Sequence, residues 1–70
     1  MQVTKQQLTL GTERVTVRIP QAQADFAALE LNNWDPKLIN GQVVVVKEKT
    51  LASRSDAWVK MITNNFVRAA

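Results

Sequence analysis

The sequence has 70 residues, with no cysteine, no histidine, a hydrophobic fraction of 46% and a net charge of +3. A chain of this length predicts one small domain, residues 1–70, whose limited core favours stabilisation as a homodimer. Without cysteine and histidine there is neither a disulfide framework nor a Cys/His zinc site, and the common nucleophiles and proton shuttles are missing. We therefore expect a non-enzymatic protein with no cofactor and no metal.

The longest aliphatic run consists of valines at residues 43–46. It is far shorter than the roughly 20 apolar residues of a membrane helix. The N-terminal residues also lack the apolar segment of a signal peptide. We expect a cytoplasmic protein without a membrane partner.

Two extended segments are predicted near the start of the chain. Residues 8–10 and 14–19 each alternate in polarity, and the segment between them contains a glycine. This pattern predicts a β-hairpin, or one good strand preceded by a looser one. In the second segment Val and Ile share one face, whereas Arg14, Thr16 and Arg18 share the other.

A helix is predicted next, over residues 21–33. Pro20 ends the preceding strand and fits the first turn of a helix, where its missing N–H costs nothing. Phe26 and Leu29 fall on one apolar stripe. The helix is expected to end before Pro36, because the residue that precedes a proline disfavours helical geometry.

A valine-rich strand follows the helix. Asn40 and Gly41 form a turn signal, and residues 42–47 are rich in β-branched side chains. Four consecutive valines predict burial on both faces of the strand, and the pairing partner lies either in the same chain or in a second copy.

The last predicted element is an amphipathic helix. Ser53 and Asp56 resemble a capping box at its start. Its apolar stripe repeats at spacings of three and four and comprises Trp58, Met61, Ile62, Phe66 and Ala69. The predicted order is therefore β-β-α-β-α, which is a small α+β domain.

The strand face of Arg14, Thr16 and Arg18 is the first candidate binding site. Arginine donates two hydrogen bonds to guanine, and threonine contacts either a base or a thymine methyl group, so this face suits base readout in a major groove. The competing interpretation is an ordinary amphipathic strand with a solvated polar side.

The start of the last helix is the second candidate site. A helix N-terminus carries unsatisfied N–H groups and a partial positive charge, which favour a phosphate. Ser53, Arg54 and Ser55 are the candidate phosphate contacts, with Arg54 donating directly. A plain helix cap is the competing interpretation, and Asp56 opposes an anion there.

These segments together resemble the ribbon-helix-helix DNA-binding family. The resemblance comprises the strand Arg-Val-Thr-Val-Arg-Ile-Pro at residues 14–20, a following helix, and Ser-Arg-Ser-Asp-Ala-Trp opening a second helix at residues 53–58. It implies that two protomers pair one strand each into an antiparallel ribbon that enters the major groove, above a dimer core built by the helices. It places bases against Arg14, Thr16 and Arg18, and phosphate against Ser53, Arg54 and Ser55.

A different architecture follows if the valine strand joins the hairpin. The chain then forms a three-stranded sheet with two helices, as in a small winged-helix protein of the phage excisionase kind or a phage-type inhibitor of a host protein.

The sequence predicts a homodimer that binds duplex DNA sequence-specifically, as a transcription regulator or accessory factor of a phage, plasmid or other mobile element. The alternative function is a small protein-interaction module. It would inhibit or remodel a host protein through an exposed strand edge or helix face.

Overall fold

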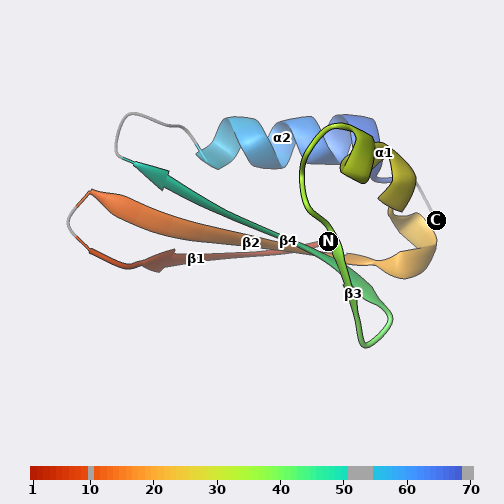
Figure 1. Ribbon diagram of the computed structural model, residues 1–70, viewed down its shortest axis with the longest axis horizontal. Helices are drawn as coiled ribbons and strands as arrows, with labels where there is room; N and C mark the ends of the chain where they lie inside the picture. Colours follow the sequence, from red (N-terminus) through yellow and green to blue (C-terminus); the bar gives the residue numbers. More distant parts are fainter. Residues whose placement is uncertain (10, 51–54, 69–70) are drawn as a thin grey trace.

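A four-stranded antiparallel sheet carries both helices on one face (Figure 1). The computed structural model describes residues 1–9, 11–50 and 55–68. The strand order is β1-β2-β4-β3. The elements in chain order are β1 (Gln2–Gln7), β2 (Thr12–Pro20), the 3-10 turn η1 (Gln21–Gln23), α1 (Phe26–Leu31), β3 (Lys37–Ile39), β4 (Gln42–Thr50) and α2 (Ser55–Phe66). The predicted α+β class is confirmed, and β3 is an addition to the predicted order.

The N-terminal hairpin is present, but its first strand is β1 and not residues 8–10. The chain already reverses at Leu8 and Thr9: the Leu8 amide donates to the Thr12 carbonyl at 3.2 Å, and the Thr12 amide donates to the Thr9 carbonyl at 3.0 Å. Gly11 supports this reversal with a φ of +83°, a conformation that glycine adopts without steric cost. The prediction of a strand at residues 8–10 was therefore wrong for residues 8 and 9, and residue 10 lies outside the described residues.

The predicted helix over residues 21–33 is divided into η1 and α1. Ala24 between them is extended and pairs with Val67, which follows α2. Asp25 then caps α1, because its carboxylate accepts a hydrogen bond from the Ala28 amide at 3.2 Å. A tertiary contact with the end of the chain thus interrupts an otherwise good helical segment.

The valine strand β4 pairs within the chain, between β2 and β3. Val43 and Val45 face the helices, and Val44 is buried on the opposite side of the sheet, whereas Val46 is 45% exposed. Burial on both faces is thus confirmed for part of the run. The predicted turn connects β3 to β4 through Asn40 and Gly41, whose φ values are +50° and +76°, as a tight hairpin requires.

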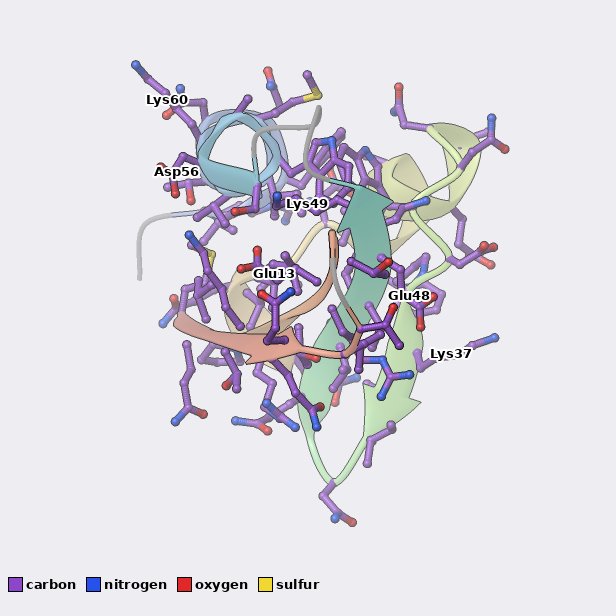
Figure 2. The ribbon with its side chains drawn as sticks, turned by 90° about the vertical axis from the view of Figure 1, so that its left-hand side faces the viewer. Glu13, Lys37, Glu48, Lys49, Asp56 and Lys60 are labelled. Atoms are coloured by element: carbon purple, nitrogen blue, oxygen red, sulfur yellow. The ribbon has the colours of Figure 1, made fainter. Side chains whose placement is uncertain are left out.

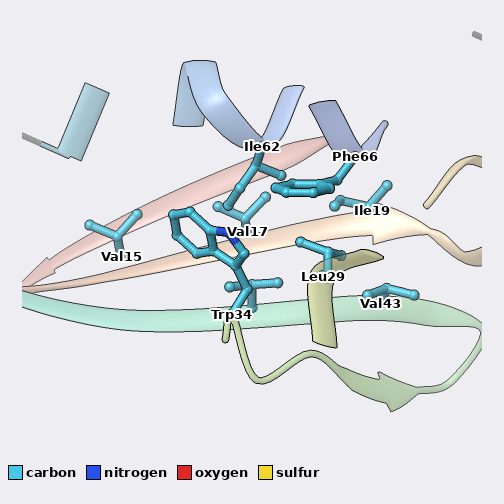
Figure 3. Packing of buried hydrophobic residues seen from close by; sticks show 9 residues of the cluster. Val15, Val17, Ile19, Leu29, Trp34, Val43, Ile62 and Phe66 are labelled. Carbon is cyan, nitrogen blue, oxygen red and sulfur yellow. The ribbon is translucent and has the colours of Figure 1, made fainter. Parts of the chain in front are cut away.

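The core lies between the sheet and the helices (Figure 3). Trp34 is 9% exposed and meets Phe66 edge to face, with ring centroids 6.5 Å apart. Trp58 is partly buried against this cluster, but Met61 is exposed, so its predicted place on the buried stripe was wrong. The buried cluster comprises Val15, Val17, Ile19, Leu29, Trp34, Val43, Val45, Ile62 and Phe66.

Candidate functional site

Among the residues that the structure describes, no element covers the face of the sheet opposite α1 and α2, and we call it the open face (Figure 1). In β2 the buried Val15 and Val17 alternate with Arg14, Thr16 and Arg18, each of which is partly exposed. Because successive side chains of a strand point to opposite faces, the three polar residues point away from the core. The structure therefore brings the sequence-predicted base-contacting residues together on the open face.

Strand β1 places a second polar row beside them. Residues directly opposite each other in an antiparallel pair share a face, and the β1–β2 register sets Gln2 against Arg18, Thr4 against Thr16 and Gln6 against Arg14. We call this two-stranded set of open-face side chains the polar ribbon. Its members are Gln2, Thr4, Gln6, Arg14, Thr16 and Arg18.

The two arginines of the polar ribbon differ in their partners. Arg14 forms an ion pair with Glu48 of β4, with Nη2 and Nε at 3.0 and 3.3 Å from Oε1. Arg18 donates only a long hydrogen bond, 3.5 Å, to the Thr4 hydroxyl, and no carboxylate of the described residues pairs with it. Arg18 is therefore the arginine of the ribbon with an uncompensated charge.

The other half of the open face is more apolar. The register places Ile39 of β3 and Val46 of β4 there, and both are exposed. The aromatic side chains of the described residues belong to the helix side of the sheet, where they form or contact the core; they are Phe26, Trp34, Trp58 and Phe66. The described part of the open face thus offers no aromatic platform on which bases could stack.

The predicted phosphate site is only partly visible. Ser53 and Arg54 lie outside the described residues. Ser55 is the first residue of α2 and is 6% exposed, so its hydroxyl offers little surface to a phosphate. The phosphate contact at this helix start stays a prediction.

Beside Ser55, the N-terminal turn of α2 is joined to β1 by an ion pair. Lys5 Nζ lies 2.8 Å from the Asp56 carboxylate. The hydrogen bond to Asp56 raises the pKa of Lys5 above its ordinary value; desolvation opposes this rise, and the charges of Asp56 and Glu13 add to it by smaller amounts. Since a raised lysine pKa favours the protonated form, Lys5 stays charged through neutral pH, and the pair weakens as the pH rises through that pKa.

Sequence reasoning missed β1 as half of the site. Its alternating pattern contains a single apolar residue, Val3, so the hydrophobic signal of a strand was too weak. The available signal was polar: Gln2, Thr4 and Gln6 recur at every second position, which places them on one strand face. The carboxylate that neutralises Arg14 was also missed, because Glu48 is its neighbour only through strand pairing.

Comparisons with protein-family models, with curated proteins and with solved structures find no match to this chain. Over residues 1–9, 11–50 and 55–68, acidic side chains do not gather into a group that could hold a metal ion. No helix in the same ranges has the length and apolarity needed to cross a membrane.

Proposed function

We propose that this protein binds duplex DNA through the polar ribbon and acts as a sequence-specific regulator or accessory factor of a mobile element. One observation carries the proposal: over residues 2–7 of β1 and 12–18 of β2, every open-face side chain is a hydrogen-bonding group on the uncovered side of the sheet. Arginine, glutamine and threonine are side chains that read base edges in the major groove. Arg18 adds a positive charge that attracts the phosphate backbone.

Duplex DNA fits this surface better than a single strand does. Proteins that bind single strands stack successive bases on aromatic side chains, and the aromatic residues described in this structure pack on the other side of the sheet. A major groove, about 12 Å wide, admits a two-stranded β-ribbon. The polar ribbon presents two neighbouring strands of polar side chains on the uncovered face of the sheet.

The ribbon-helix-helix resemblance stays a prediction, and the proposal does not depend on it. In the arrangement that it implies, the strand with Arg14, Thr16 and Arg18 pairs with the same strand of a second protomer. Here β2 already has β1 on one edge and β4 on the other. The polar ribbon therefore offers within one chain what that family builds from two.

Replacing Arg18 with alanine is the direct test of base readout. We expect the variant to lose about 1–3 kcal/mol of binding free energy on a duplex selected by the wild-type protein from a random pool, and to discriminate less between sequences. The reason is that Arg18, unlike Arg14, has no carboxylate partner among the described residues. Fluorescence anisotropy at fixed salt measures both effects.

Arg68→Ala is the matched control, because it removes the same charge from an exposed residue beyond the end of α2. It should leave the affinity for the selected duplex nearly unchanged. If Arg18→Ala lost the same binding free energy on selected and random duplexes, Arg18 would contact a phosphate and not a base. An unchanged affinity for Arg18→Ala would refute readout by the ribbon.

A protein-interaction module is the second candidate function, and a separate observation favours it. Ile39 of β3 and Val46 of β4 are exposed apolar residues on the open face, and exposed apolar surface suits a protein partner. A chain that shows no salt-dependent affinity for DNA would favour this candidate over the first.

A further inference from the structure

The two edges of the sheet differ in how they are protected. Exposed strand edges are templates for pairing with other chains, and proteins normally block them with short strands, prolines, bulges or charges. The β3 edge is blocked in this way: the strand has three residues, Pro36 precedes it, and Asp35 and Asn40 on its two sides have positive φ values.

The β1 edge has none of these features. The strand has six residues, all exposed, and its register with β2 runs without a bulge from Gln2 to Gln7. Its single charged residue, Lys5, is on the helix face and is held by Asp56. The charge of Lys5 therefore does not block the β1 edge against pairing with another strand.

The backbone groups available along this edge can be identified. In an antiparallel pair, a residue directs both its N–H and its C=O toward the same neighbouring strand, and the next residue directs them away. The Leu8 amide donates to Thr12 of the neighbouring strand, so the even-numbered residues of β1 bond to β2. The N–H and C=O groups of Val3 and Lys5 consequently point outward from the edge.

We propose that β1 pairs antiparallel with β1 of a second copy of this chain, about a two-fold axis that passes beside Thr4. A two-fold axis perpendicular to the sheet places the open faces of both copies on the same side of the joined sheet. About such an axis, one residue of β1 must lie directly opposite the same residue of the partner's β1. Residues 2–7 overlap most fully when that residue is Thr4 or Lys5. Centring on Lys5 would oppose two lysines, which is unfavourable, whereas centring on Thr4 opposes two threonines, which is favourable.

The side-chain pairs of this register are compatible on both faces. Val3 lies opposite the partner's Lys5 on the helix face, where their outward backbone groups exchange hydrogen bonds. On the open face, Gln2 lies opposite the partner's Gln6, and amide side chains can hydrogen-bond to each other.

Helix α2 adds charge complementarity to the strand pairing. A groove beside β1 is lined by Val3, Lys5, Asp56, Val59 and Lys60, and Figure 2 shows Asp56 and Lys60 on the flank of α2 on the β1 side.

Two contacts align the helix with the strand: Lys5 Nζ with Asp56 at 2.8 Å, and the Thr63 hydroxyl with the Met1 sulfur at 3.5 Å. Along the direction of the strand, Thr4 of β1 therefore lies beside the part of α2 between Asp56 and Lys60. The two-fold axis then brings Asp56 toward the partner's Lys60, and Lys60 toward the partner's Asp56.

This dimer would join the two sheets into one, with both polar ribbons facing the same way. Such a surface has the two-fold symmetry of a palindromic DNA site. The inference goes beyond the proposed function and does not rest on it, because its support is the edge, the register and the charges.

Thr4→Cys in this cysteine-free chain tests the two-fold axis directly. In the proposed register the two copies of residue 4 form a non-hydrogen-bonded pair with Cα atoms about 4.5 Å apart, within the range of roughly 4.4–6.8 Å that a disulfide spans. We expect most of the variant to form a disulfide-linked dimer under mild oxidation. Gln6→Cys is the matched control, because its two copies would lie about 14 Å apart along the paired strands.

Sedimentation velocity on a second pair of variants identifies the edge. Val3→Lys places a lysine opposite the partner's Lys5 on each side of the axis, and should weaken self-association about tenfold. Leu38→Lys makes the same change on the β3 edge and should leave the dimer intact. Circular dichroism verifies that each variant is folded.

Three results would overturn the proposal. The first is a wild-type chain that stays monomeric at about 100 μM, a concentration at which even a weak dimer is populated. The second is equal cross-linking of Thr4→Cys and Gln6→Cys, which indicates random collision. The third is a folded Val3→Lys variant that dimerises like the wild type. None of these measurements contains DNA, so a failure of the dimer is distinguishable from a failure of the proposed function.

Discussion

Replacing Trp34 with alanine is expected to lower the free energy of unfolding by about 3–5 kcal/mol, the usual cost of truncating a buried aromatic residue. Trp34 is 9% exposed and contacts Phe66 edge to face. The Lys47 ammonium also lies 5.4 Å from the centre of its ring, close enough for a cation–π interaction. Because small domains have about 5–15 kcal/mol of stability in total, this variant should be partly unfolded at 37 °C.

Urea denaturation followed by circular dichroism measures this loss, and Leu31→Ala provides the control. Leu31 is 84% exposed, so its truncation should change stability by no more than about 0.5 kcal/mol. If the two variants had equal stability, Trp34 would not be part of the core.

The second large effect is expected at adjacent valines of β4. Val45→Asp should abolish folding, because Val45 is 1% exposed on the helix face and an unpaired buried carboxylate costs several kcal/mol. Val46→Asp introduces the same side chain one residue later, where the position is 45% exposed on the open face. That variant should stay folded.

Thermal denaturation of the two aspartate variants therefore tests the register of β4. A shift of one residue moves every side chain of a strand to the opposite face. A folded Val45→Asp together with an unfolded Val46→Asp would mean that the helices cover the other face of the sheet.

The sequence predicted those elements whose signal is local. The alternation of Arg14–Ile19 and the turn at Asn40 and Gly41 were sufficient to identify β2 and the β3–β4 reversal. The apolar spacing of Ile62 and Phe66 identified α2.

Other features depend on distant parts of the chain and could not be predicted in this way. The helix predicted over residues 21–33 is interrupted because the Asp25 amide donates to the Phe66 carbonyl at 2.8 Å. The burial of Trp34 depends on its contact with Phe66 of α2, which is distant in the sequence. Such contacts are set by tertiary packing, which overrides local propensity.

The candidate site was also predictable where its features are local and unpredictable where they depend on strand pairing. The shared face of Arg14, Thr16 and Arg18 follows from the period of a strand, and the structure places them as expected. The addition of β1 and the neutralisation of Arg14 by Glu48 required the strand register. In the structure Arg18 is therefore a better candidate for DNA contact than Arg14, and a row of glutamine and threonine side chains from β1 joins the candidate site.

A titration at several salt concentrations tests whether the polar ribbon binds duplex DNA. Labelled random duplex DNA is titrated with the wild-type protein at several salt concentrations, and fluorescence anisotropy gives the affinity at each. If the ribbon binds DNA, the affinity should fall linearly with salt on a log–log plot with a slope of about −2 or steeper, because each neutralised phosphate contributes about −0.9. Absence of binding at low salt, or an affinity that does not change with salt, would contradict it.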